Sequence, residues 1–218
     1  MIPADATLDE IRAALAPRLA ENAAFDGWSE AAVDAAAAAE GLDADVARLA
    51  FPGGAVDMIV AWFTQIDAAM IAAVPDETLA AMKVRQRIAA QVEARLDALA
   101  PNREALRRAL AILARPQHAL RAAKLGWHAA DLMWRRAGDT ATDYNHYTKR
   151  TILAGVYAAT ITVFLDDESE GLADTRAFLS RRIDGILKFE KTKAQLLKQR
   201  ERMPSLSRFV GRLRYPPA

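Results

Sequence analysis

The order of apolar and polar residues along the chain predicts helices throughout. No run shows the period-two alternation of a half-buried strand, and prolines and glycines separate the apolar stretches. Apolar residues instead recur three or four positions apart, as in Val56, Ile59, Val60 and Phe63 and in Ile88, Val92, Leu96 and Leu99. The sequence therefore predicts an all-α protein, a single-domain bundle of about ten helices.

Capping and breaking residues set the expected boundaries of these helices. Thr7 and Glu10 have the spacing of a capping box for a helix at about 8–20, which Pro17 is expected to kink or to end early. Ser29 opens a second helix that Gly41 closes, and Asp43 caps a short third helix that ends by Phe51. Further helices are expected at about 55–74, 77–99, 103–114, 117–137, 145–165 and from 171 onward, the last with Leu179, Ile183, Ile186 and Leu187 on one face.

The second half of the helix at 145–165 has an unusual composition. Residues 151–165 contain no charged side chain. These fifteen residues are fewer than the roughly 20 that a helix needs to cross a bilayer. We therefore expect this helix to be buried on all sides.

The formal net charge of +1 conceals two regions of opposite charge. Residues 1–80 contain three basic and fourteen acidic side chains, whereas the segment from Lys191 to the end contains eight basic side chains and one acidic one. Within that basic segment, apolar residues recur at helical spacing and the arginines fall largely on the opposite side, a pattern typical of an interfacial helix. The residues expected to contact a membrane are Leu206, Arg208, Phe209, Val210, Arg212 and Leu213.

These patterns predict three parts of the chain. Residues 1–190 form a helical lipid-binding domain, whose N-terminal part at 1–54 resembles a helix-turn-helix unit, 191–204 form a basic linker, and 205–218 form an amphipathic tail that binds an anionic membrane surface. The alternative for the tail is that it packs against its own domain or frays. The acidic start at Met1–Asp5 lacks the features of a signal or transit peptide, and there is no cysteine, so we expect a cytoplasmic chain without disulfides, bound peripherally to the inner membrane.

DNA binding is one alternative function. The helices on either side of Gly41 have the length and turn of a helix-turn-helix unit, and this pattern resembles the N-terminal domain of the tetracycline-repressor family. However, residues 26–57 hold seven acidic side chains and only Arg48 as a base, whereas phosphate contacts require Lys and Arg. A ligand-responsive transcriptional regulator is therefore kept as the alternative, and no nucleic-acid partner is expected.

Catalysis by the chain itself is the other alternative. The three histidines, His118, His128 and His146, do not occur in the Glu-x-x-His spacing of helical di-iron sites. Asp143 lies three residues before His146, which fits a helix cap beside a surface histidine. No phosphate-binding loop, nucleophile elbow or dinucleotide fingerprint is present. We therefore expect a protein that is not an enzyme and has no metal site or cofactor.

Four segments resemble the coenzyme-Q-nine family of ubiquinone-biosynthesis proteins: 25–29 (FDGWS), 51–55 (FPGGA), 131–134 (DLMW) and, most specifically, 137–150 (AGDTATDYNHYTKR). The similarity covers about residues 20–195. It implies a tetracycline-repressor-like fold without DNA binding, a hydrophobic pocket for an isoprenoid lipid or quinone intermediate, and a C-terminal amphipathic helix. Members of this family present quinone intermediates to a di-iron demethoxyubiquinone hydroxylase, so iron would belong to the partner. Since repressor-like folds often dimerise through their last two helices, a homodimer is a candidate assembly.

The resemblance also implies a surface for the hydroxylase. The Trp-Tyr pair of the family motif falls on His146 and Tyr147, so the sequence departs from the family at His146. The residues expected to bind the partner are Trp134, Asp143, Tyr144, His146, Tyr147 and Arg150. Lipid contacts are chosen from the helical pattern of apolar residues, and the alternative for each of them is that it packs in the core. They are Trp62, Phe63, Ile66, Leu132, Met133, Leu153, Val156, Tyr157 and Ile161.

Overall fold

The computed structural model describes residues 2–3, 5–142 and 144–185. All regular elements in these residues are helical, which confirms the predicted all-α class. The α-helices are α1 (Leu8–Asp26), α2 (Glu30–Glu40), α3 (Ala44–Leu49), α4 (Ala55–Ala73), α5 (Asp76–Ala80), α6 (Val84–Leu99), α7 (Arg103–Leu113), α8 (Ala119–Arg136) and α9 (Tyr144–Leu165), followed by a helix over residues 173–185. Three short 3₁₀ turns lie at Ala100–Asn102, Pro116–His118 and Glu170–Leu172. The predicted linker at 191–204 and tail at 205–218 lie outside the described residues.

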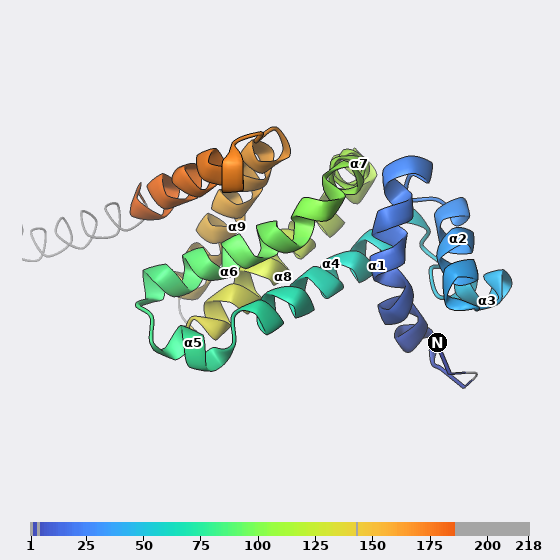
Figure 1. Cartoon of the computed structure of the whole chain (residues 1–218). Helices are drawn as coiled ribbons and strands as arrows, with labels where there is room; N and C mark the ends of the chain where they lie inside the picture. The colour runs from blue at the N-terminus through green and yellow to red at the C-terminus, as the bar shows by residue number, and fades with distance from the viewer. Residues whose placement is uncertain (1, 4, 143, 186–218) are drawn as a thin grey trace, which may run out of the picture. The chain divides into compact units, whose positions relative to one another are not determined.

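The chain divides into two compact units, Met1–Leu179 and Ser180–Ala218, and every contact discussed below lies in the first. In this unit α1 packs against α2, α4 and α7, α4 packs against α6, and α8 packs against α9. Figure 1 shows α1, α2 and α3 gathered near the start of the long helix α4, with α5 at its other end.

Helix α1 is longer than the sequence predicts. The capping box is present, since the Glu10 amide donates to the Thr7 hydroxyl and the Thr7 amide to the Glu10 carboxylate. Pro17 lies inside the helix and lacks the N–H that would bond the carbonyl four residues earlier, that of Ala13. Gln65 of α4 donates its side-chain amide to that carbonyl at 3.0 Å. The expected early end at Pro17 is therefore wrong, because another helix supplies the missing hydrogen bond.

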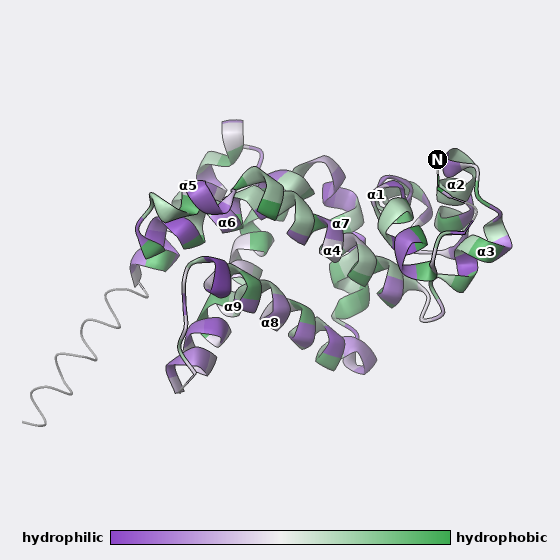
Figure 2. Ribbon diagram, turned by 90° about the horizontal axis from the view of Figure 1, so that it is seen from below, coloured by the Kyte–Doolittle hydropathy of each residue, from purple (hydrophilic) through white to green (hydrophobic). Residues whose placement is uncertain are grey.

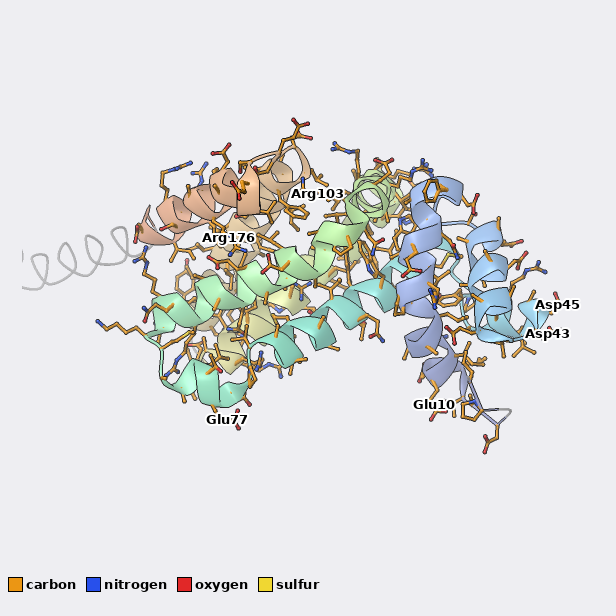
Figure 3. All side chains as sticks on the ribbon, viewed as in Figure 1. Glu10, Asp43, Asp45, Glu77, Arg103 and Arg176 are labelled. Atoms are coloured by element: carbon orange, nitrogen blue, oxygen red, sulfur yellow. The ribbon has the colours of Figure 1, made fainter. Side chains whose placement is uncertain are left out.

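The boundaries of α2 and α3 are as predicted. Gly41 ends α2 in the left-handed conformation, with φ 70° and ψ 25°, which is strained for any residue with a side chain. Asp43 caps α3 by accepting hydrogen bonds from the Asp45 and Val46 amides. Both Asp43 and Asp45 are exposed at the start of this helix (Figure 3).

The expected single helix at 77–99 is wrong, because the structure divides it into α5 and α6. Gln86 caps the second piece by accepting from the Lys83 amide at 3.0 Å. Arg87 stabilises the break by donating to the carbonyls of Ala80 and Met82, which are left open at the end of α5. Long-range partners of this kind are not visible in the local pattern of apolar residues.

Helix α9 is buried on one side only, so the expectation of burial on all sides is wrong. Leu153, Tyr157 and Phe164 are buried, whereas Thr151, Gly155, Ala158 and Thr162 are exposed. The exposed residues are small and uncharged, which explains why composition alone suggested full burial. The neighbouring helix α8 is amphipathic as well, and Figure 2 shows hydrophobic and hydrophilic residues following one another along it.

Helix α4 is the most apolar described helix, and by length and composition it could cross a membrane. Its residues Met58, Ile59, Trp62, Ile66 and Met70 are nevertheless buried against the rest of the domain. We therefore assign α4 to the core of the fold.

Candidate functional site

A cavity of about 720 Å³ opens between α4, α6, α7, α8 and α9. Its walls are mostly apolar, since the side chains that line it include Val60, Phe63, Leu110, Leu113, Leu125 and Ile161. Its volume lies within the range of about 300–1,000 Å³ that small-molecule sites have. The fold therefore provides space for an apolar ligand.

A cluster of polar side chains interrupts these apolar walls. Asp67 of α4 and Arg95 of α6 are 8% and 3% exposed and form a buried ion pair through Arg95 Nη1 and Asp67 Oδ1. The Nε of Arg95 donates to the Tyr157 hydroxyl at 2.9 Å, and the guanidinium lies 5.1 Å from the centre of the Tyr157 ring. His128 Nε2 lies 3.4 Å from the other oxygen of Asp67. The cavity thus combines apolar walls with a buried polar cluster.

Basic side chains lie where the cavity opens to the surface. Arg121, Lys124 and His128 of α8 all line it and are all exposed. Arg121 bonds Asp57 at 3.1 Å, whereas Lys124 forms no ion pair with any residue in the described part of the chain. An anionic group at the entrance would therefore meet positive charge.

The predicted lipid contacts separate into two groups. Phe63, Tyr157 and Ile161 line the cavity. Trp62 is buried beside it, 5.3 Å from the Trp28 ring and 5.4 Å from the Phe63 ring. Like Trp62, the other predicted contacts are absent from the lining: Ile66, Met133 and Leu153 are buried in the core, and Leu132 and Val156 are partly exposed.

The polar residues of the cavity were not predicted from the sequence, although the sequence contains a pattern that indicates them. Asp67 continues the apolar face of Val60 and Phe63, four residues beyond Phe63, and Arg95 falls on the face of Val92 and Leu99. A charged residue on an otherwise apolar helix face indicates a buried partner. The partner itself was not predictable, because the two residues lie 28 positions apart in the sequence and on different helices.

The surface predicted to bind a protein partner lies at the start of α9. Tyr144 and Tyr147 are 75% and 61% exposed. The His146 and Tyr147 rings lie 5.1 Å apart, nearly edge to face, and both lie close to Trp127 of α8. Together these rings form an exposed aromatic surface. Asp143 lies outside the described residues.

Two other residues predicted for this surface lie beneath it. Arg150 is 1% exposed and bonds Asp131 at 2.5 Å and Asp139 at 2.9 Å. Trp134 donates its ring N–H to the Lys149 carbonyl at 3.0 Å. These contacts join α8, the following loop and α9, so Arg150 and Trp134 hold the exposed aromatic rings in place.

The same network changes the ionisation of Asp139. Burial by itself raises the pKa of this carboxyl group, but hydrogen bonds from Lys149 and Arg150 outweigh burial and hold the pKa below its ordinary value. Gly138, beside it, has φ 88°, and a β-carbon there would lie 3.2 Å from Arg87 Nη1. This arginine donates to the Ala137 carbonyl. The first residues of the most specific sequence motif are therefore held by a hydrogen bond from Arg87 at Ala137 and by ion pairs with Lys149 and Arg150 at Asp139.

Among the described residues no group of three or more His, Cys, Asp or Glu side chains is placed to hold a metal ion.

Residues 119–190, which include α8 and α9, match the COQ9 family profile. The ubiquinone biosynthesis protein COQ9 of Rattus norvegicus is 33% identical over 177 residues, which cover 78% of this chain and 56% of the rat protein. The human protein of the same name is 30% identical and covers 78% of this chain and 55% of that protein. The resemblance to the coenzyme-Q-nine family is confirmed. The chain spans about half the length of these COQ9 relatives, which are mitochondrial proteins.

The fold is also shared with a transcriptional regulator. The crystal structure of the TetR transcriptional regulator from Nitrosomonas europaea matches with a TM-score of 0.65, covering 80% of this chain and 96% of that chain. At 24% sequence identity, this match shows the TetR-like fold alone. The predicted tetracycline-repressor-like fold is therefore confirmed.

Proposed function

We propose that this chain is a non-catalytic accessory protein of ubiquinone biosynthesis that holds an isoprenoid lipid or quinone intermediate in the cavity between α4, α6, α7, α8 and α9. The cavity is the observation that carries the proposal. It is open to the surface and mostly apolar, as a carrier of a water-insoluble chain requires. The names of the COQ9 relatives supply the pathway.

The proposal continues with a protein partner and a membrane. The exposed rings of Tyr144 and Tyr147 are the contact for a di-iron demethoxyubiquinone hydroxylase, to which the bound quinone intermediate is presented. The amphipathic segment at 205–218 brings the protein to the cytoplasmic face of an anionic membrane. The hydroxylation itself belongs to the partner.

The direct test is organic extraction of the purified full-length protein followed by mass spectrometry. The expected result is a co-purified isoprenoid, quinone or phospholipid in an amount comparable with the protein. Ala122 and Ala123 offer a matched pair of variants, because they are neighbours on α8 but only Ala122 lines the cavity. Ala122→Trp should reduce the extracted lipid severalfold, whereas Ala123→Trp should leave it unchanged. Equal lipid in both variants, or none in the wild type, would contradict the proposal.

A further inference from the structure

The buried ion pair in the wall of the cavity has features that packing alone does not require. Removing a carboxylate and a guanidinium from water costs free energy, and an ion pair in such a position is often no more stable than apolar residues of the same volume. Asp67 and Arg95 are nevertheless both buried in a wall that is otherwise mostly apolar. Their position at the cavity suggests a role in binding.

Arg95 has a hydrogen-bond donor available to a ligand. Its Nη1 bonds Asp67 and its Nε bonds the Tyr157 hydroxyl. Within the part of the chain that the structure describes, Nη2 donates to no other residue. It is also not one of the fully buried polar atoms without a partner, so it is not closed off from solvent. Because Arg95 lines the cavity and its side chain is otherwise buried, at 3% exposed, Nη2 is accessible from the cavity. A fixed donor therefore faces a mostly apolar space.

The charge balance at this donor selects the kind of group that it binds. Arg95 and Asp67 form an ion pair without net charge, and the second Asp67 oxygen faces His128 Nε2 at 3.4 Å. A phosphate placed at Nη2 would come close to the Asp67 carboxylate and would be repelled. An uncharged acceptor, such as a carbonyl oxygen, receives a charge-assisted hydrogen bond without that repulsion. Anionic groups are favoured instead at the entrance, beside Lys124.

We propose that Arg95, held by Asp67 and Tyr157, is a head-group subsite that binds the uncharged, carbonyl-bearing head of a lipid inside the cavity, with the apolar chain against Phe63, Leu125 and Ile161. The proposal rests on the lipid-carrying function above and adds to it the chemical class and the orientation of the ligand. Arg95 provides the specificity, and the walls provide the bulk of the affinity.

The test compares ligands that share one chain and differ in the head. The full-length protein is titrated by calorimetry with a ubiquinone of two isoprene units, with the geranyl hydrocarbon that lacks the ring, and with geranyl diphosphate. The wild type should bind the quinone about tenfold to a hundredfold more tightly than the hydrocarbon, as expected for one hydrogen bond from a charged donor. Geranyl diphosphate, whose anionic head is favoured at the entrance, should bind with an affinity that does not depend on Arg95.

Two variants remove the subsite in different ways. Arg95→Lys keeps the charge beside Asp67 but lacks the fork of donors, so the preference for the quinone should fall to near one. Asp67→Asn combined with Arg95→Met removes both charges at similar volume, leaves no uncompensated charge, and should have the same effect. As the control, Phe63→Ala should weaken the quinone and the hydrocarbon equally, so that their ratio is retained.

The outcomes separate the two proposals. If both ligands bind and their ratio is unchanged in the folded Arg95 variants, the head-group subsite is wrong and the lipid-carrying function stands. If neither ligand binds to the wild type, both are wrong. A diphosphate that binds in the cavity and depends on Arg95 would also overturn the assignment to an uncharged head. The double variant keeps the test decisive if Arg95→Lys does not fold.

Discussion

At the scale of the residue, two buried arginines have different roles. Arg150 donates to two carboxylates, those of Asp131 and Asp139, and to the His146 carbonyl, so its polar atoms serve the joint between α8 and α9. Arg95 has one carboxylate partner and a donor at the cavity. The contacts of Arg150 therefore stabilise the exposed aromatic surface that lies above it, whereas those of Arg95 leave one donor available for a ligand.

Within the exposed aromatic surface, a substitution of Tyr147 gives the most direct test of partner binding. Its ring is 61% exposed, so Tyr147→Ala removes little buried area and should leave the melting temperature nearly unchanged. Affinity for the di-iron hydroxylase, measured by biolayer interferometry, should fall by about tenfold if the ring is an interface anchor. Phe25 is 84% exposed on α1 and supplies the control, because Phe25→Ala should not change this affinity. A large fall in melting temperature for Tyr147→Ala would instead make the ring structural.

Asp167 fixes the turn between α9 and the following helix. It accepts from the Ser169 hydroxyl and amide and from the Thr175 hydroxyl and amide, at 2.5–2.8 Å. These hydrogen bonds, first that of the Ser169 side chain and then that of Thr175, hold the pKa of the Asp167 carboxyl far below its ordinary value, although burial opposes them. The ionised form is therefore strongly favoured in the folded protein.

This shift predicts a pH-dependent contribution to stability. Because the folded pKa is depressed, the contribution is complete above the ordinary value of 3.8 and is lost as the pH falls toward the folded pKa. Asp167→Asn should lower the free energy of unfolding at pH 7 by about 2 kcal/mol, and its difference from the wild type should shrink below pH 4. Urea unfolding at several pH values measures both effects. Asp166→Asn is the control, since the Asp166 side chain is 75% exposed, and an equal loss in the two variants would contradict the assignment.

The sequence predicted some of these residues and not others. Tyr147 followed from the family motif, and its exposure fits the role expected of it. Arg150 came from the same motif, but its burial depends on Asp131 and Asp139, which reach it from another helix and from a loop. Asp67 and Arg95 were recognisable only as charges on apolar faces. Their pairing required the three-dimensional arrangement of α4 and α6.

At the scale of the element, local signals placed most helix boundaries. The capping by Thr7 and Asp43 and the left-handed Gly41 act within a few residues, so the sequence alone predicts them. The failures occurred where a distant side chain completes the backbone hydrogen bonds. Gln65 allows α1 to continue through Pro17, and Arg87 stabilises the break between α5 and α6. Pattern and propensity contain no information about such partners.

The amphipathic tail is an element that the sequence predicts and that lies outside the described residues. Its four apolar side chains would each contribute about 1.5–3 kcal/mol if fully inserted, before the cost of ordering the helix. Each Lys or Arg close to an anionic leaflet adds about 1 kcal/mol. Since neither contribution is sufficient alone, membrane binding should require anionic lipid and should weaken as salt rises.

Liposome flotation tests this prediction on the full-length protein, on Phe209→Ser with Leu213→Ser, and on a chain truncated after Met203. Only the full-length wild type should float with anionic vesicles, and all three should retain the same circular dichroism. Equal flotation of the three proteins would show that the tail is not the anchor.

At the scale of the whole molecule, the fold and the cavity differ in how far the sequence determines them. The all-α class and the TetR-like architecture follow from helix periodicity and from the family resemblance, and both are confirmed. The cavity does not follow from periodicity, because its walls come from helices spread over α4–α9. A residue on an apolar helix face lines a cavity or fills the core depending on how neighbouring helices pack. Phe63 and Met133 were predicted together as lipid contacts, yet only Phe63 lines the cavity.

The last prediction concerns DNA, since a repressor-like fold places a helix-turn-helix unit at α2 and α3. A recognition helix must bring Lys or Arg to the phosphates, yet α3 begins with exposed Asp43 and Asp45. Its one basic side chain, Arg48, is bonded to Asp34 at 2.6 Å. We therefore expect no specific complex with duplex DNA at physiological salt. A gel shift with a library of duplexes and excess competitor DNA measures this, and the competitor removes non-specific binding by the basic segment at 191–218. A complex that survives the competitor and depends on sequence would establish the regulator in place of the accessory protein.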